Sequence, residues 1–240
     1  MQGTTMIEPK VSVIIISYNR APMLGWTIQS VIRQTYSNLE VVIVDASEDE
    51  QAKHVARTCA FTREHKWGLA QCCFNFKYVE IKNTGIADAC NTGVKSSTGE
   101  FLIFLHDDNW IEPTYVEKVV ALATDGIGIV STDMHVFSNT EDSVVKTGPV
   151  TLDILKNENV IHASSLLRRE AFDQTGGNKE DVYEDWELWL NVVKHEWQVR
   201  NVDEPLFHYR KAENSAITQY KERHEERVRN MRKIHGDIYG

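Results

Sequence analysis

Two adjacent carboxylates follow one of the most apolar runs in the sequence. Asp107 and Asp108 come directly after Phe101–Leu105, which reads FLIFL. Carboxylates side by side at the end of a buried strand repel each other, and Mg²⁺ or Mn²⁺, which prefers oxygen ligands and often takes one or two carboxylates plus substrate phosphates, would relieve that repulsion. The pair therefore favours a divalent-cation site. Capping of a helix that begins near Pro113, or simple solvation, stays open as the alternative.

A second acidic pair opens a segment with strong helical spacing. Glu184 and Asp185 stand at the start of Tyr183–His195, in which Trp186 and Leu190 recur on one helical face. Acidic side chains in a first turn are favoured by the helix dipole without any function. A carboxylate fixed at the start of a rigid helix is also well placed to act as a general base. The spacing alone allows both interpretations.

Polar segments follow three of the apolar runs. They are Ser17–Arg20 (SYNR), Asp45–Asp49 (DASED) and His106–Asn109 (HDDN). Because ligands bind outside the carboxyl ends of the strands in open α/β sheets, three such ends predict one ligand site. Neither G-x-G-x-x-G nor G-x-x-x-x-G-K-[ST] occurs in the sequence, so a phosphate group would have to be held without the usual glycine-rich loops.

Alternating strands and helices must position these ends. Four short runs are β-branched or aromatic and nearly continuous in apolarity, as in strands covered on both faces: Val11–Ser17, Leu39–Asp45, Lys77–Ile81 and Phe101–Leu105. Helical spacing is present in Pro22–Gln34, Ile86–Ser97 and Pro113–Ala123. This order predicts a doubly wound α/β sheet. Residues 51–76 are longer than a usual crossover, which predicts a helix followed by an irregular insertion.

The second half of the chain is less regular. The pattern predicts one or two strands in Ile127–Phe137, a polar hairpin or mobile loop in Ser138–Pro149, strands in Val160–Leu167, Gln198–Val202 and Leu206–Tyr209, and helices in Tyr183–His195 and Tyr220–His235. No repeat or low-complexity linker interrupts the chain. We therefore expect one domain, residues 1–218, with a C-terminal helical extension, residues 219–240.

The composition argues against several classes of protein. The 240 residues include 26 Lys and Arg against 35 Asp and Glu, a formal charge of −9, which disfavours nucleic acid as a partner. The sequence has no run of 18 apolar residues and no apolar signal-peptide core in its first ten residues. The four cysteines are therefore expected to be reduced thiols in a cytoplasmic protein, and the adjacent Cys72 and Cys73 do not match zinc-ligand spacing.

The order of these segments resembles inverting glycosyltransferases of the family 2 type. The opening VSVIIISYNRAPMLGWTIQSVIRQTYSNLEVVIVDASED matches the start of that family, and residues 83–93 match its N-x-G-x-x-x-A-R-N-x-G segment. GEFLIFLHDDNWIEP corresponds to the strand with the D-x-D-like motif, and EDWELWL to the segment with the base. The resemblance covers about residues 10–215. It implies the GT-A fold, a doubly wound mixed sheet with helices on both faces.

The resemblance also implies a donor site and a metal site. Ser17, Tyr18 and Asn19 would line the nucleoside pocket, and Asp45 would hydrogen-bond the base, usually uracil, which indicates a UDP-linked sugar donor. Asp107 would lie against the ribose or the metal shell. Asp108 would bind the Mn²⁺ or Mg²⁺ that bridges the diphosphate. The protein would then transfer a sugar from a nucleotide-diphosphate donor.

The remaining roles concern the acceptor and the C-terminal side of the site. The resemblance implies that Asp185 is the general base that deprotonates an acceptor hydroxyl, on a glycan, a lipid-linked sugar or a protein. Arg210 and Lys211 are candidate contacts for the diphosphate, since both side chains are pure donors. Ala212 stands where many relatives carry a histidine, which leaves His208 as the substitute metal ligand from this side.

Departures from the family pattern keep two other functions open. His106 and Asn109 replace carboxylates of the usual D-x-D-D motif, and Cys90 replaces a common arginine. These changes allow a nucleotide-sugar-binding module without transfer activity. A nucleotidyltransferase would also use metal-bound carboxylates, but it usually has a glycine-rich, lysine-bearing loop after the first strand, which is lacking here.

The C-terminal segment has a charge of its own. Gln219–His235 holds six Lys and Arg and three Glu, with Val228 and Met231 on a narrow apolar stripe. Such a helix packs on its own domain, pairs with a second copy in a homodimer, or lies on an anionic membrane surface. Peripheral contact at the inner membrane face is thus one expectation for the extension.

Overall fold

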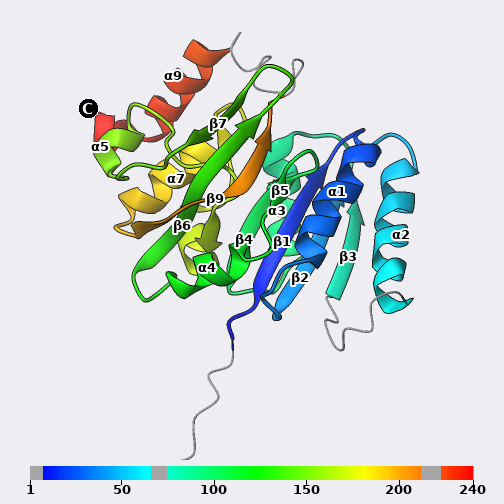
Figure 1. The fold of residues 1–240 in the computed structure, drawn as a ribbon. Coiled ribbons are helices and arrows are strands. Elements are labelled where there is room, and N and C mark those ends of the chain that lie inside the picture. Colours follow the sequence, from blue (N-terminus) through cyan, green and yellow to red (C-terminus); the bar gives the residue numbers. More distant parts are fainter. Residues whose placement is uncertain (1–7, 66–74, 212–222, 240) are drawn as a thin grey trace, which may run out of the picture.

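A computed structural model describes residues 8–65, 75–211 and 223–239, and in this part of the chain nine strands form one sheet (Figure 1). The strands are β1 (Val11–Ser17), β2 (Leu39–Asp45), β3 (Asn75–Glu80), β4 (Phe101–His106), β5 (Trp110–Ile111), β6 (Ile127–Phe137), β7 (Asp142–Val145), β8 (Leu166–Arg168) and β9 (Gln198–Arg210). The helices are α1 (Ala21–Ile32), α2 (Gln51–His65), α3 (Ile86–Lys95), α4 (Tyr115–Ala121), α5 (Leu152–Leu155), α6 (Arg169–Thr175), α7 (Glu184–Lys194), α9 (His224–Ile234) and α10 (Gly236–Tyr239).

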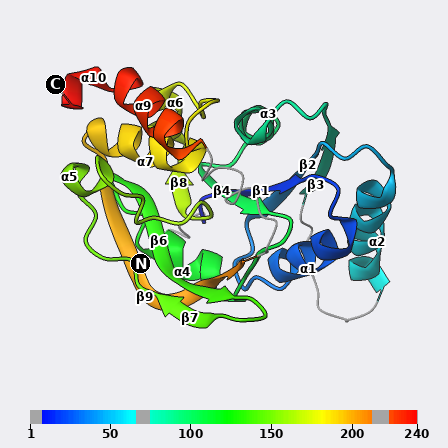
Figure 2. The same cartoon turned by 90° about the horizontal axis from the view of Figure 1, so that it is seen from above.

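The sheet is mixed and doubly wound, as the sequence predicts. The strand order is β3-β2-β1-β4-β8-β6-β9-β5, and β7 pairs with β6. The first four strands are parallel, whereas β8 is antiparallel to both of its neighbours. Helices α1, α2 and α4 cover one face, and α3, α6 and α7 cover the other (Figure 2).

Burial on both faces explains why the first strands read as continuous apolar runs. Along β1, Val13 and Ile15 pack into the core beneath α1, and Ile14 packs into the core beneath α3. The approach of α3 is close: a Cβ at Gly93 would lie 2.2 Å from the Ile14 Cγ2 atom. A larger residue at position 93 would therefore push α3 away from the sheet.

Two predicted strand boundaries were wrong. Strand β8 begins only at Leu166 instead of at Val160, because the Ser165 N–H and Oγ both donate to the carbonyl of His162 and close a turn. Strand β9 is one strand where two were predicted. It continues past Pro205, which lacks an N–H, because the ladder with β6 shifts register around its partner Asp133.

The other predicted elements are present within one or two residues of their expected ends, except that α9 begins at His224, and the predicted start at Tyr220 lies outside the described residues. Ser138–Pro149 contains the second strand of the β6–β7 hairpin. Helix α2 opens the segment 51–76, whose expected insertion lies partly in residues 66–74, outside the described part. Cys59 and Cys90 are buried thiols. Cys72 and Cys73 also lie outside the described residues.

The C-terminal helices pack against the domain. Met231 of α9 is fully buried in the core shared with α7, and His235 Nε2 lies 2.8 Å from Glu187 Oε1 inside that core. Lys194 at the end of α7 pairs with Asp237 in α10. The apolar stripe of α9 is therefore covered by this chain, although the first residues of the predicted extension, 219–222, are outside the described part.

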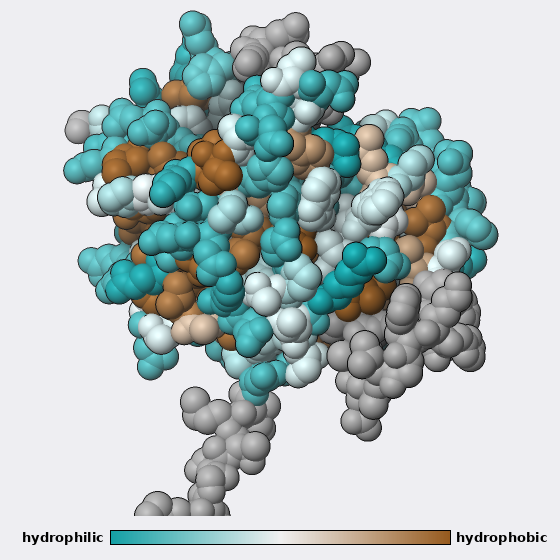
Figure 3. Space-filling view, in the orientation of Figure 1, coloured by the Kyte–Doolittle hydropathy of each residue, from teal (hydrophilic) through white to brown (hydrophobic). Residues whose placement is uncertain are grey.

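The surface carries no large apolar area on the face seen in Figure 3, where hydrophilic residues separate small hydrophobic groups. The exposed large hydrophobic side chains include Trp26, which is 74% exposed on α1. Within the described residues, no helix combines the length and apolarity needed to cross a membrane.

A buried carboxylate fastens the amino edge of the sheet. Glu40 accepts hydrogen bonds from Ser12 Oγ, at 2.5 Å, and from the Thr98 and Gly99 N–H groups, and it pairs with Lys10. Burial raises the pKa of Glu40, but the bonds from Ser12, Thr98 and Lys10 outweigh it and lower the pKa to about 2. The ionised carboxylate therefore stabilises the fold.

Replacement of Glu40 by Gln should lower the free energy of unfolding at pH 7 by roughly 1–3 kcal/mol, because charge-assisted bonds to several donors are weakened. Because the pKa of Glu40 is lower in the folded than in the unfolded protein, its ionised carboxylate stabilises the folded state fully above the unfolded pKa of about 4.5. This stabilisation is lost as the pH falls towards the folded pKa of about 2. Urea titrations between pH 7 and pH 3 should show the gap between E40Q and wild type narrowing with acidification. A gap that is constant with pH would contradict the role of the ionised form.

Candidate active site

The carboxyl ends of three parallel strands meet at one edge of the sheet. Ser17 at the end of β1 pairs in register with Asp45 at the end of β2, and Ile16 pairs with His106 at the end of β4. The segments after these strands therefore start side by side. This is the convergence that the three polar strand ends predict.

A chain of hydrogen bonds joins the β1 and β2 ends. Asp45 Oδ1 accepts from the Ser47 N–H at 3.0 Å and from Ser47 Oγ at 2.5 Å, and its other oxygen accepts from the Tyr78 hydroxyl. Ser47 Oγ in turn accepts from the Asn19 N–H at 2.8 Å, and Asn19 Oδ1 accepts from the Glu48 N–H at 3.1 Å. Asn19 has a positive φ of 53°, a conformation that asparagine tolerates. The loop after β1 is thus held against the loop after β2.

The β1 loop also contacts the acidic pair after β4. The Tyr18 N–H donates to Asp107 Oδ2 at 3.0 Å. Arg20 Nη1 lies 2.7 Å from Asp108 Oδ2 and 3.5 Å from Asp107 Oδ1. Burial raises the pKa of Asp107 to about 6, and the neighbouring Asp108 adds to the effect, whereas the Tyr18 N–H and Arg20 oppose it. The carboxylates of Asp107 and Asp108 are thus buried and lie next to the guanidinium of Arg20.

The second acidic pair lies in the first turn of its helix and not at the N-cap position. The N-cap of α7 is Tyr183, which makes no side-chain cap bond. Asp185 Oδ2 accepts from Asn159 Nδ2 at 3.1 Å, and its Oδ1 accepts from the Trp186 N–H at 2.7 Å. Burial raises the pKa of both carboxyl groups of the pair, that of Glu184 to about 8, where the charge of Asp185 contributes as well.

Tyr209 of β9 lies within electrostatic range of one carboxylate of each acidic pair. Its pKa is raised to about 12, chiefly by burial; the charges of Asp108 and Asp185 contribute to the rise, and Arg20 opposes it. Asp185 in turn lies within range of the charge of His106. The end of β4, the end of β9 and the start of α7 therefore lie within electrostatic range of one another.

Helix α3 supports the segment that leads to Asp185. Asn91 Nδ2 donates to the Asn178 carbonyl at 3.0 Å, and the Asn178 N–H donates back to Asn91 Oδ1 at 2.9 Å. At the start of α3, the Asp88 N–H donates to Glu180 Oε1, and a Cβ at Gly85 would lie 2.7 Å from the same carboxylate. The N-x-G segment of the sequence thus holds the loop before α7.

The two predicted basic residues have different surroundings. The Arg210 guanidinium lies 4.9 Å from the ring centre of Phe137 and 5.6 Å from that of Trp110, and it has no ion-pair partner among the described residues. Lys211 Nζ instead pairs with Glu141 Oε2 at 2.5 Å, at the turn of the β6–β7 hairpin. Arg210 is the more available donor for an anion.

The structure corrects the expectation for His208. Its Nε2 lies 2.7 Å from Glu112 Oε1 and its Nδ1 lies 2.9 Å from His135 Nδ1, so both ring nitrogens already have protein partners. The ring stacks on Trp110. Among the described residues, no group of three or more His, Cys, Asp or Glu side chains could hold a metal ion.

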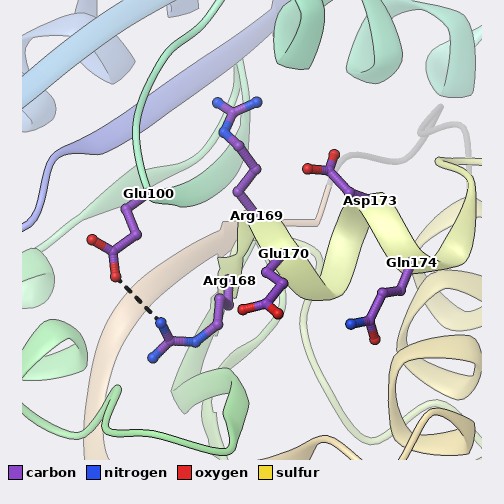
Figure 4. Close-up of a pocket in the computed structure, with 6 residues that line it drawn as sticks. All are labelled: Glu100, Arg168, Arg169, Glu170, Asp173 and Gln174. Carbon is purple, nitrogen blue, oxygen red and sulfur yellow. Dashed lines mark hydrogen bonds and ion pairs between the residues drawn. The ribbon is translucent and has the colours of Figure 1, made fainter.

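A surface depression of about 630 Å³ lies at the opposite, amino edge of the sheet (Figure 4). Its two arginines are engaged elsewhere: Arg168 donates to the carbonyls of Ile127 and Ala123, and Arg169 donates to the carbonyl of Gly99. In the close-up, Arg168 also reaches Glu100. This depression is a structural junction between β4, β8 and α6.

Three residues of the site were missed by sequence reasoning: Arg20, Asn159 and Tyr209. Arg20 is the last residue of the polar segment Ser17–Arg20, which the sequence places at the end of the first strand, but the sequence pattern assigns no role to it. Asn159 and Tyr209 are brought in from 26 residues before and 24 residues after Asp185, and no local pattern marks either of them.

Glu184→Gln should make the protein more heat-stable at pH 8. A raised carboxyl pKa favours the folded state only while the group is protonated, so the wild type loses stability as the pH rises from about 4.5 to about 8. The variant lacks this titration. Its midpoint of unfolding should exceed that of the wild type by about 3 °C or more at pH 8 and match it at pH 5. Equal midpoints at both pH values would contradict a buried acid at position 184.

Comparison with known proteins identifies relatives over most of the chain. YwdF, an uncharacterized glycosyltransferase of Bacillus subtilis, is 29% identical over 206 residues, which cover 80% of this chain and 71% of that protein. WfaP of Escherichia coli, a UDP-Glc:α-D-GlcNAc-diphosphoundecaprenol β-1,3-glucosyltransferase, is 24% identical and covers 83% of this chain and 76% of its own. Other relatives are longer: the chain spans 15% of Streptococcus pneumoniae GlyA and 33% of B. subtilis EpsH.

Solved structures show the same fold. The mannosyltransferase PcManGT of Pyrobaculum calidifontis, in complex with GDP-Man and Mn²⁺, superposes with a TM-score of 0.68 at 20% identity, over 92% of this chain and 62% of that one. Residues 1–349 of Staphylococcus aureus TarS, in complex with UDP-GlcNAc, give 0.68 at 18% identity, over 87% and 60%. The predicted GT-A fold is confirmed. The family model for glycosyl transferase family 2 matches residues 12–176, more than half of the sequence, so the chain belongs to that family.

Proposed function

We propose that this protein transfers a sugar from a nucleotide-diphosphate donor to an acceptor hydroxyl, with inversion at the anomeric carbon. The observation that carries the proposal is the presence of two acidic pairs, Asp107-Asp108 at the end of β4 and Glu184-Asp185 at the start of α7, with Asp108 and Asp185 both within electrostatic range of Tyr209. One pair suits a cation and a diphosphate, and the other suits proton transfer. Membership of glycosyl transferase family 2 supports the same reaction class.

The donor's nucleoside is assigned to the loops after β1 and β2. Ser17, Tyr18 and Asn19 would line it, and Asp45, which Ser47 and Tyr78 hold in place, would contact the base. We propose a UDP-linked donor, because the names of WfaP and of the TarS complex both contain a uridine nucleotide.

The metal-ligating atoms at the end of β4 fit a divalent cation. Asp107 and Asp108 present only oxygen atoms, and the donor's phosphates would supply the further oxygens that Mn²⁺ or Mg²⁺ requires. Asp108 would hold the ion, and Asp107 would lie at the ribose or in the metal shell. The Mn²⁺ in the PcManGT complex supports this assignment. Bound there, the ion would supply charge neutralisation to the leaving diphosphate.

Asp185 would take the proton of the acceptor hydroxyl. Its raised pKa makes it a stronger base than an ordinary aspartate, and Asn159 orients its carboxylate. The hydroxyl oxygen would attack the anomeric carbon as the bond to the diphosphate breaks on the opposite face. Arg210 and Lys211 would donate hydrogen bonds to the departing phosphates.

The acceptor and the location of the protein are further proposals. We assign residues 1–218 to the transferase domain and 219–240 to the extension, and we place the protein in the cytoplasm. The acceptor hydroxyl would belong to a glycan, a lipid-linked sugar or a protein. Because the apolar stripe of α9 is buried, contact with the inner membrane face would rest on its exposed basic residues, such as Arg229 and Arg232. Liposome flotation of the full chain tests that contact.

A panel of nucleotide sugars with Mn²⁺ or Mg²⁺ tests the proposed reaction. The cognate donor should raise the midpoint of unfolding only when the metal is present, and it should be hydrolysed slowly without an acceptor. Stabilisation without any hydrolysis or transfer would instead favour a binding module. Release of pyrophosphate from a nucleoside triphosphate and a sugar phosphate would favour a nucleotidyltransferase.

A further inference from the structure

The acidic pair after β4 already has a cation beside it. Arg20 Nη1 lies 2.7 Å from Asp108 Oδ2 and 3.5 Å from Asp107 Oδ1. The side chains of Asp107 and Asp108 are 3% and 10% exposed, whereas that of Arg20 is 35% exposed. The anions are thus fixed inside the protein, and the guanidinium reaches them from the solvent side.

The backbone around Arg20 is anchored, so only its side chain is free to change partner. Its carbonyl accepts from the Met23 and Leu24 N–H groups and begins α1. The preceding Asn19 is bonded to both Ser47 and Glu48. A long side chain on a fixed backbone can swing away from the pair without any rearrangement of the loop.

Arg20 and a divalent ion would compete for the negative charge of the same carboxylate, Asp108. Asp108 Oδ2 cannot sit in contact with both a guanidinium and a metal without bringing two cations together. A nucleoside diphosphate removes this conflict, because its phosphates provide ligands for the metal and also a bidentate acceptor for the arginine.

We propose that Arg20 is the resident counter-ion of Asp107 and Asp108, and that it excludes a divalent cation until a nucleoside diphosphate arrives to take the guanidinium. Metal and nucleotide then load together. This inference rests on the proposed function, since it takes the acidic pair as the metal site. Arg20 is a positioning residue under this proposal, and its effect is measurable without any turnover.

Electron paramagnetic resonance of free Mn²⁺ tests the proposal on the full chain, with UDP and GDP as nucleotide probes. Wild type should bind Mn²⁺ weakly alone and at least about ten-fold more tightly with a nucleotide. Arg20→Gln should bind Mn²⁺ alone about ten-fold more tightly than wild type does, and its nucleotide dependence should shrink. Arg20→Lys, which keeps the charge, should resemble wild type. Circular dichroism checks that each variant is folded.

The double variant with Arg20→Gln and Asp108→Asn tests whether Mn²⁺ binds at Asp107 and Asp108. It should lose the tighter Mn²⁺ binding that is expected of R20Q. Equal Mn²⁺ affinity of folded R20Q and wild type, without nucleotide, would overturn the counter-ion role and leave the proposed function standing. If neither protein binds Mn²⁺ even with UDP or GDP, the metal part of the proposed function fails, and the inference fails with it.

Discussion

Replacement of Asp185 by Asn is expected to lower turnover by about 10²–10⁴-fold, the usual contribution of a general base. Asparagine keeps the size of the side chain and can still contact the Trp186 N–H, so the loss would report the proton acceptor rather than the fold. Donor affinity should change little, because the nucleotide contacts lie at the strand ends. Initial rates of transfer, together with nucleotide-sugar titrations, measure both quantities.

The acid side of the pH profile provides a second readout for this variant. Burial raises the pKa of Asp185, so wild-type turnover should begin to fall at a higher pH than an ordinary aspartate would give. D185N should lack that fall. Asp173→Asn, an exposed aspartate on α6, is the matched control and should keep the wild-type profile. Near-wild-type turnover of D185N would exclude the base assignment.

Replacement of Asp108 by Ala is expected to abolish the metal-dependent part of donor binding. The substitution removes one of two adjacent carboxylates, so it also relieves repulsion, and the variant should remain folded. Calorimetric titration with the cognate nucleotide sugar, with Mn²⁺ and with a chelator, should show the two affinities becoming equal in D108A.

The control for Asp108 is Asp125→Asn. Asp125 is exposed just before the amino end of β6, away from the carboxyl ends of β1, β2 and β4, so the variant should keep the response to Mn²⁺. The assignment of the metal to Asp108 fails if the wild type binds the donor equally well in chelator. It fails also if D108A retains the full effect of Mn²⁺.

The sequence predicts the fold better than it predicts the site. The ends of β1, β2 and β4 are predictable because strands buried on both faces read as continuous apolar runs bounded by polar residues. Two other features are not predictable from the sequence: the turn at His162 and the continuation of β9 past Pro205. Each depends on hydrogen bonds to a neighbouring segment. Local pattern carries no record of such partners.

The same limit applies to the site residues. The acidic pairs are visible in the sequence because each stands at the end of a strongly patterned element. The contact of Arg20 with Asp108 spans 88 positions, and the bond from Asn159 to Asp185 spans 26. The two partners of His208 lie 73 and 96 positions away in the sequence, so the contacts of its ring nitrogens could not be foreseen. The roles assigned to the site residues stay predictions until the variants are measured.

The buried contact between Glu187 and His235 couples two positions that are far apart in the sequence. The first turn of helix α7 contains Asp185 and Glu187. The Glu187 carboxylate contacts His235 inside the core. Loss of either partner would strand a polar group away from water, a change that usually costs several kcal/mol. We therefore expect positions 187 and 235 to vary together among related chains.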